Sequence, residues 1–216
     1  MSAVGAIGAA SFSLFLAAAL IIAAVPGAGI FYVAARTLSG GRAAGIASTS
    51  GTALGGLVHV IAGGVGVSAL VLASAQLFAA LKFAGALYLI WLGIKTFRDA
   101  GHVPSVQTDD VGARRAFWQG AAVEALNPKT AAFFLAFIPQ FLNPAAPNPA
   151  LQFVMLGLIS VALNSSADLI VVLIVAATRA RLVGRPGLTQ RLRQGSGLFI
   201  AGLGVSLALT RRPLAN

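Results

Sequence analysis

The chain contains no cysteine, and only 9% of its 216 residues are charged. The lack of cysteine excludes a disulfide framework, a thiol nucleophile and a cysteine-ligated metal site. The scarcity of charge is unusual, because a soluble domain normally carries about a quarter of charged residues. Since 58% of the residues are hydrophobic, too little polar surface is left to cover a water-soluble globule. We therefore expect an all-α integral membrane protein in a lipid bilayer.

Long stretches of the chain lack charge almost completely. No charged side chain precedes Arg36, and residues 130–178 contain a single one, Asp168. Uncharged apolar runs of about 20 residues can cross the hydrocarbon core of a bilayer as a helix. Six apolar runs, three of them with one or two charged residues, predict a multi-pass protein with spans at residues 11–35, 43–72, 76–97, 117–142, 151–178 and 194–210.

The net charge of +10 could suggest a nucleic-acid partner, but the positive residues lie in short segments between the apolar runs. Basic residues accumulate in cytoplasmic loops of membrane proteins, so this distribution indicates topology and no nucleic-acid binding. It predicts that the first, third (98–115) and fifth loops are cytoplasmic and that both the N-terminus and the C-terminus are outside. The loop residues are Arg36 and Arg42; Lys95, Arg98, Arg114 and Arg115; and Arg179, Arg181, Arg185, Arg191 and Arg193.

Two of the predicted spans are interrupted by proline, the first at Pro26 and the fourth at Pro128. Three spans per half is an odd number, so a duplication would give two inverted repeats, residues 1–97 and 116–216. Paired, proline-interrupted spans at corresponding places point to the midplane site of a transporter. The simpler alternative is two unrelated proline kinks, which are common in membrane helices.

The first break consists of Pro26 followed by Gly27, Ala28 and Gly29. Proline lacks an amide hydrogen and therefore leaves backbone carbonyl groups without partners. The two glycines allow the helix to unwind without a steric penalty. We expect this break to line a protein interior or a wet cavity.

The second break is bracketed by Glu124, Asn127 and Lys129, beside Pro128. An ionisable residue at membrane depth is costly and is therefore a functional candidate by default. Two interpretations remain open: these residues bind substrate, or a buried ion pair between Glu124 and Lys129 only fixes helix packing.

Two further titratable residues lie inside predicted spans. Asp168 is close to Asn164, Ser165 and Ser166, and a carboxyl group there could accept and release a proton; alternatively, neighbouring polar groups satisfy it as a neutral acid. His59 could relay protons, or it could simply form a hydrogen bond to a neighbouring helix. With only two histidines in the chain, we expect no metal site and no bound cofactor.

The segment Gly51-Thr52-Ala53-Leu54-Gly55 places small residues at helical spacing. Such a stripe allows helices to approach closely. It fits packing within the bundle as well as it fits a homodimer interface.

Ala125-Leu126-Asn127-Pro128-Lys129, followed by Phe133-Phe134 and Ile138-Pro139-Gln140-Phe141, resembles the signature of the lysine exporter/homoserine–threonine exporter (LysE/RhtB) family. The resemblance implies amino-acid efflux across the bacterial inner membrane, driven by the proton gradient. In agreement with a proton-driven and not an ATP-driven transporter, the chain has no Gly-rich phosphate-binding loop ending in Lys-Ser/Thr. Family members usually carry Pro-Gly-Pro-Asn at the first break, where this chain has Pro26-Gly27-Ala28-Gly29.

These observations favour a secondary exporter of amino acids or related small metabolites that works by proton antiport. In this hypothesis Lys129 and a helix N-terminus attract the carboxylate of a zwitterion, and Glu124 or Asp168 holds its ammonium group. Two alternatives are an intramembrane enzyme and a passive channel or assembly subunit. We expect no enzyme, since the sequence has neither the His-Glu-x-x-His zinc motif nor a serine in a recognisable nucleophile turn.

Overall fold

The computed structural model describes residues 7–73, 75–99, 112–143 and 147–182, together with isolated residues between 190 and 209. All regular secondary structure in these described residues is helical, which confirms the predicted helical class. The first half contains α1 (Ala9–Ala24), α2 (Ala28–Ala73) and α3 (Ala75–Arg98). The second half contains α4 (Ala113–Ala125), α5 (Pro128–Ala132), a π-helical turn η3 (Phe133–Phe137), a 3₁₀ turn η4 (Ile138–Phe141) and α6 (Pro149–Leu182).

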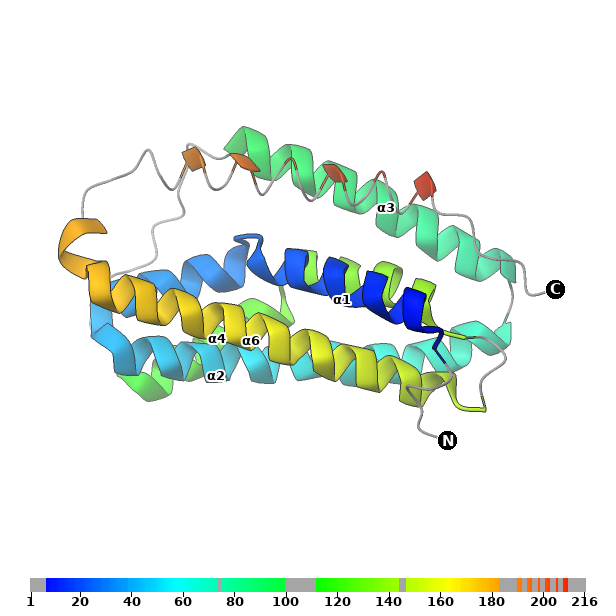
Figure 1. Ribbon diagram of the computed structural model, residues 1–216, viewed down its shortest axis with the longest axis horizontal. Coiled ribbons are helices and arrows are strands. Elements are labelled where there is room, and N and C mark those ends of the chain that lie inside the picture. Colours follow the sequence, from blue (N-terminus) through cyan, green and yellow to red (C-terminus); the bar gives the residue numbers. More distant parts are fainter. Residues whose placement is uncertain are drawn as a thin grey trace.

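Helix α2 consists of two helical segments that meet at Gly41. Gly41 has φ 75° and ψ −168°, a backbone conformation that is essentially restricted to glycine. The chain reverses direction at this residue (Figure 1). The sequence predicts a loop between the first and second spans here, and the structure makes the turn with a single non-helical residue.

Both predicted helix breaks are present. The first separates α1 from α2 at residues 25–27, and the second separates α4 from α5 at residues 126–127. At the second break the helix axis bends by 43°. Further along, Pro139 cannot donate a hydrogen bond to the carbonyl group of Leu135, and the chain passes there from the wider π turn η3 to the tighter 3₁₀ turn η4.

Two helical stretches are long and apolar enough to cross a membrane, Ala28–Gly66 and Pro149–Thr178, and the bent pair of Ala113–Ala125 and Pro128–Phe141 can form a third span. Large apolar side chains such as Leu14 and Ile61 are exposed, whereas Glu124 and Asp168 are buried. A protein with apolar residues outside and ionisable residues inside is suited to lipid. Only isolated residues of the predicted sixth span, 194–210, are described.

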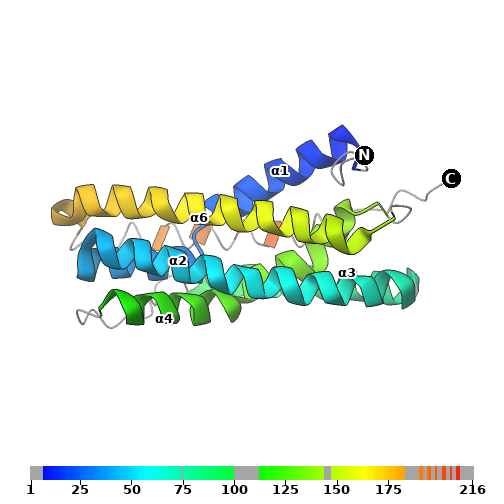
Figure 2. The ribbon, with the colours of Figure 1, turned by 90° about the horizontal axis from the view of Figure 1, so that it is seen from below.

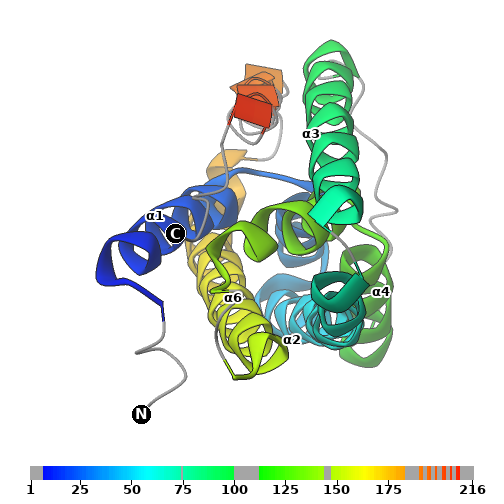
Figure 3. The ribbon, with the colours of Figure 1, turned by 90° about the vertical axis from the view of Figure 1, so that its right-hand side faces the viewer.

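Helix α2 occupies the centre of the bundle, between α4 and α6 (Figure 2). Seen along the bundle axis, α3 lies at the periphery (Figure 3). The contact between α2 and α4 depends on glycine: a Cβ atom on Gly51 would overlap the carbonyl group of Phe117, and one on Gly120 would lie 2.7 Å from the carbonyl oxygen of Ser48. The small-residue stripe therefore packs within the chain.

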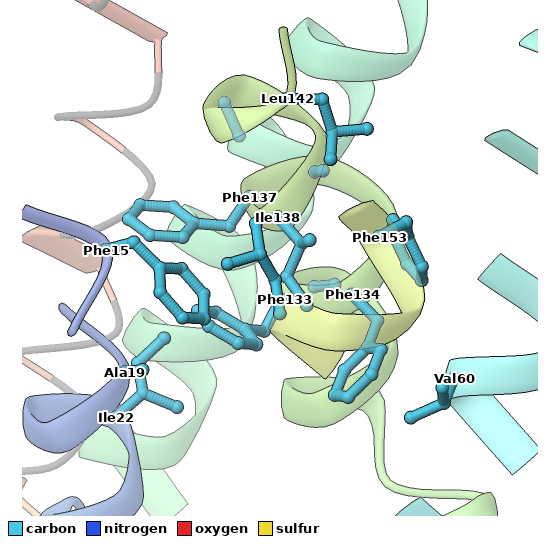
Figure 4. Packing of buried hydrophobic residues seen from close by; sticks show 14 of the residues in the cluster. Phe15, Ala19, Ile22, Val60, Phe133, Phe134, Phe137, Ile138, Leu142 and Phe153 are labelled. Carbon is cyan, nitrogen blue, oxygen red and sulfur yellow. The ribbon is translucent and has the colours of Figure 1, made fainter. Parts of the chain in front are cut away.

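A cluster of buried aromatic side chains fixes the second broken helix in place. Phe133, Phe134 and Phe137 extend from η3 toward Phe15 of α1 and Phe153 of α6 (Figure 4). The rings of Phe133 and Phe137 stack with centroids 5.3 Å apart, and Phe134 meets Phe153 edge to face at 6.2 Å. This cluster holds the second break against α1, beside the first break.

Candidate functional site

The prolines at the two breaks each free one backbone carbonyl group. In an α-helix the amide of residue 26 would bond to the carbonyl of Ile22, and the amide of residue 128 would bond to the carbonyl of Glu124. Proline has no amide hydrogen, so both carbonyl groups need other donors in a water-poor interior. Each of them receives a donor from a side chain on another segment.

Lys129 supplies the donor at the first break. Its Nζ atom donates hydrogen bonds to the carbonyl oxygens of Ile22, at 3.2 Å, and of Val25, at 3.0 Å. These are the last carbonyl groups of α1, where the helix dipole favours a positive charge. Lys129 is only 8% exposed, so this ammonium group connects the two breaks inside the protein.

His59 supplies the donor at the second break. Its Nε2 atom lies 3.0 Å from the carbonyl oxygen of Glu124. Because a carbonyl oxygen can only accept, Nε2 carries the hydrogen and donates it. The amide of Asn127 donates to the same oxygen, at 3.0 Å. The ring of His59 also packs against that of Phe134, with centroids 5.6 Å apart.

The carboxyl group of Glu124 is the centre of a small hydrogen-bond network. One oxygen accepts from Nδ2 of Asn127 at 2.9 Å, and the other accepts from the hydroxyl group of Thr130 at 2.6 Å. The Oδ1 atom of Asn127 in turn accepts from the backbone amide of Lys129 at 3.1 Å and so caps α5. Two donors directed at one carboxyl group are suited to its ionised form.

One of the two interpretations of Glu124 and Lys129 is a direct ion pair that fixes helix packing. In the structure the two side chains form hydrogen bonds to other partners. Lys129 bonds to the end of α1, and Glu124 bonds to Asn127 and Thr130. Both charges are nevertheless close enough to face the same cavity. The two charges therefore influence one another through space and keep separate hydrogen-bond partners.

The glycines of the first break make room for these two charges. A Cβ atom on Gly29 would lie 2.7 Å from Oε2 of Glu124. One on Gly27 would lie 3.1 Å from Nζ and Cε of Lys129. The absence of side chains at both positions lets the charged groups of the second break approach the backbone of the first.

A small cavity lies beside the two breaks. It is lined by Gly29, Glu124, Asn127 and Lys129 together with polar residues of α2 and α6, and its volume is about 20 Å³. That volume is enough for about one water molecule. On the α6 side is Asp168, which is 5% exposed. The hydroxyl group of Thr52 on α2 lies 2.8 Å from its Oδ2 atom.

The structure thus brings most of the predicted site residues together. Gly29, Glu124, Asn127, Lys129 and Asp168 all line the one cavity. Pro26 and Pro128 form the breaks beside it, and Gly27 packs against Lys129. His59 is not among the described residues that line the cavity. Its ring bonds instead to the backbone carbonyl oxygen of Glu124, at the second break.

Thr52 and Thr130 are site residues that sequence reasoning missed. Thr52 lies within the stripe Gly51-Thr52-Ala53-Leu54-Gly55, which indicates packing, and Thr130 is one uncharged residue in an apolar run. The spacing from Glu124 to Thr130 could have suggested the second contact, since both flank the same break. Nothing in the sequence pairs Thr52 with a residue 116 positions further along.

Comparisons with known proteins place the chain in a family. Residues 20–211 match the family model described as LysE type translocator. An uncharacterized membrane protein of Vibrio cholerae serotype O1 is 30% identical over 91% of this chain and 96% of its own length. A homoserine/homoserine lactone efflux protein of Salmonella typhimurium is 33% identical over 69% of this chain and 73% of its own length.

A leucine efflux protein of Klebsiella pneumoniae is 28% identical over 70% of this chain and 72% of its own length. No solved structure shows a significant match to the chain. The family match covers nearly the whole described bundle, including both breaks and the cavity between them. The chain is therefore a membrane protein that belongs to the LysE type translocator family.

Proposed function

We propose that this protein is a secondary transporter that exports amino acids or related small metabolites across the bacterial inner membrane in exchange for protons. The family match and the names of two relatives, a homoserine/homoserine lactone efflux protein and a leucine efflux protein, support the substrate class. No enzymatic step is needed for this function. The substrate would be a small molecule, and the other partner would be the lipid bilayer.

The observation that carries the proposal is the buried polar cavity where the two proline breaks meet. Two of the five carboxyl groups of the chain, those of Glu124 and Asp168, line this cavity. Burying ionisable groups in a lipid-embedded protein is costly, and such groups mark substrate and ion pathways. Helix packing alone would be served more cheaply by apolar residues.

A six-span architecture with two inverted repeats, residues 1–97 and 116–216, fits the arrangement of the described helices. The first broken segment, from α1 into α2, runs in the opposite direction to the second, from α4 into α5 (Figure 1). Opposite directions are what an inverted repeat requires, because the corresponding helices of the two halves are related by an axis in the membrane plane. The arginine-rich first, third and fifth loops would be cytoplasmic, with both termini outside.

Transport would proceed by alternating access to the cavity between the breaks. A cavity of about 20 Å³ is far smaller than the 300–1,000 Å³ or so of a typical ligand pocket. Binding therefore requires the helices around Gly29 and Asn127 to separate. Broken helices are suited to this movement, because hinges at a few element-terminal residues absorb large changes in backbone angles.

The test is an export assay in bacterial cells that express the protein and are loaded with dipeptides, which are hydrolysed inside. Each amino acid, including leucine and homoserine, is followed in the medium with and without a protonophore. We expect selective release that the protonophore abolishes. Glu124→Gln should abolish release, because it removes the buried charge, whereas Asp99→Asn should not, because Asp99 is exposed at the end of α3.

The outcomes separate the alternatives. Release that follows the concentration gradient and ignores the protonophore would indicate a passive channel. Full export by a well-inserted Glu124→Gln variant would refute the role assigned to Glu124. If no amino acid is released by a correctly inserted wild-type protein, amino-acid export is wrong.

A further inference from the structure

The hydroxyl group of Thr52 has one hydrogen but lies within hydrogen-bond distance of two oxygen atoms. The Oγ1 atom lies 2.9 Å from the backbone carbonyl oxygen of Thr49 and 2.8 Å from Oδ2 of Asp168. A carbonyl oxygen can only accept, and a hydroxyl group has a single hydrogen to donate. If Thr52 donates to Thr49, the hydrogen between Thr52 and Asp168 must come from Asp168.

The charge balance of the cavity favours the alternative in which Asp168 carries the hydrogen. The charged groups that face Asp168 are Glu124 from α4 and Lys129 from α5. Glu124 is held by two donors, and Lys129 by two carbonyl groups of α1. These two charges compensate one another, so an ionised Asp168 would add an uncompensated negative charge in a low-dielectric interior. Asp168 must be either protonated or paired with a cation.

Asp168 also has an oxygen atom available for a ligand. Its Oδ2 atom faces Thr52, but Oδ1 has no hydrogen-bond partner among the residues that the structure describes, and the side chain lines the cavity while 5% exposed. Both oxygens of Glu124, by contrast, already accept hydrogen bonds. Asp168 is thus the carboxyl group of the cavity that can take a new partner without losing an existing one.

We propose that Asp168 is the exchange group of the transporter: its carboxyl group holds either a proton or the ammonium group of the substrate, and never both. This inference rests on the proposed export function and deepens it. When an ammonium group arrives, the O–H bond of Asp168 breaks and the proton leaves to the water on the side to which the cavity is open. The carboxylate then holds the ammonium group, and the Thr52 hydroxyl group turns from Thr49 to donate to Asp168.

The same geometry defines the substrate class by its amine. Among the described residues that line the cavity, Lys129 is the positively charged one, and two of its three ammonium hydrogens already bond to the carbonyl oxygens of Ile22 and Val25, which leaves at most one for a substrate carboxylate. Recognition therefore requires a protonated amine on the substrate and does not require a free carboxylate. An amino acid whose carboxylate is masked as an amide should still bind.

The test measures binding and proton release by the purified full-length protein in weakly buffered detergent solution. The probes are L-leucine, its amide L-leucinamide, and 4-methyl-2-hydroxypentanoate, which has a hydroxyl group in place of the amine. We expect the first two to bind with release of about one proton per bound molecule, and the third not to bind. Binding of an amine without proton release would overturn the proposal, as would binding of the hydroxy acid alone or of none of the probes.

Variants identify the group that responds. Asp168→Asn should abolish proton release and weaken L-leucinamide binding by about 30-fold or more, because a buried partner of the ammonium group is lost. Ser166→Ala is the matched control, since Ser166 is exposed on the same helix. Size-exclusion chromatography verifies that both variants are folded. Proton release that persists in a folded Asp168→Asn protein would contradict the assignment.

Thr52 is a positioning residue, and its test uses the pH profile. Thr52→Val removes the hydroxyl group and should shift the pH dependence of proton release by about one unit or more, whereas Thr52→Ser keeps the hydroxyl group and should preserve the profile. A merely structural role of Thr52 would leave the profile of both variants unchanged. Failure of transport with intact binding and proton release would refute export alone and leave the exchange at Asp168 standing.

Discussion

The two broken helices follow the same plan but contribute different chemistry. The first break, at residues 25–29, has no charged side chain and supplies backbone carbonyl groups and two glycines. The second, at residues 124–130, supplies Glu124 and Lys129 with their hydrogen-bond partners. Neither break is complete alone. The difference shows how a site can be asymmetric although both helices are broken by a proline in the same way.

The charges of the second break match the dipoles of the first. Lys129 bonds to the carbonyl groups that end α1, and Glu124 lies against Gly29 near the start of α2. A helix C-terminus favours a cation and a helix N-terminus favours an anion. The second break therefore stabilises both half-helices of the first. This complementarity can be tested by removing its components one at a time.

Among the contacts that join the two breaks, the largest effect is expected for the loss of the Lys129 contact in Lys129→Met, which keeps the length of the side chain and removes its charge. The carbonyl group of Val25 loses this donor, and that of Ile22 keeps only the 3.3 Å hydrogen bond from the amide of Val25. A buried unsatisfied group costs about 1–3 kcal/mol. We expect a loss of about 3 kcal/mol of stability in a thermal unfolding assay and a rate of export that is lower by about tenfold or more. Lys95→Met, at an exposed lysine of α3 whose ammonium group lies 5.1 Å from the centroid of the Trp91 ring, should cost no more than about 1 kcal/mol. Equal stability of the two variants would contradict the bridging role of Lys129.

A smaller but selective effect is expected from the glycines. Gly29→Ala places a methyl group 2.7 Å from Oε2 of Glu124, and that carboxyl group cannot retreat without losing Asn127 or Thr130. Gly27→Ala meets the flexible end of Lys129 at 3.1 Å, which can move by a few tenths of an ångström. We expect export to fall about tenfold in Gly29→Ala and about twofold in Gly27→Ala.

Gly66→Ala is the control for this pair, because no atom of the residues that the structure describes lies within 4 Å of a Cβ atom at that position. It should leave export unchanged. The measurement is the initial rate of export, normalised to the amount of inserted protein. Full activity of Gly29→Ala would show that Glu124 does not depend on close contact with the first break.

The smallest effect is expected at His59, which bonds to the backbone of the second break. His59→Ala removes one of two donors to the carbonyl group of Glu124, and the amide of Asn127 remains. We expect a loss of about 1 kcal/mol in thermal unfolding and retained, proton-coupled export. Complete loss of export in a folded His59→Ala protein would instead identify this histidine as a proton relay.

Much of this arrangement follows from the sequence. Apolar runs locate the helices that the structure describes, and Pro26-Gly27 and Asn127-Pro128 locate both breaks within a residue or two. These features are local, since a proline interrupts the hydrogen bonds of its own helix whatever packs against it. The predicted loop between the first two spans, residues 36–42, also contains the reversal of the chain, although a single non-helical residue, Gly41, makes it.

The partners of the site residues could not be predicted. The sequence places Glu124 and Lys129 near one another and suggests either substrate contacts or an ion pair. The structure directs Lys129 to a carbonyl group 107 positions away and joins Asp168 to Thr52 across 116 positions. Such contacts depend on which helices pack together and how they are rotated, and a hydrophobic pattern that is uniform around the helix carries no information on either.

Thiol labelling can test whether the cavity between the two breaks opens alternately to each side of the membrane. The chain has no cysteine, so a single introduced one can be followed without background. Ala53 lines the cavity, whereas Ile61 is 67% exposed on the apolar outer surface.

A small charged thiol reagent is applied from outside in intact cells and from the cytoplasmic side in inverted vesicles. The account predicts that Ala53→Cys reacts from both sides, that L-leucine slows the reaction, and that Ile61→Cys stays unlabelled. Reaction of Ala53→Cys from one side only, unaffected by L-leucine, would contradict it.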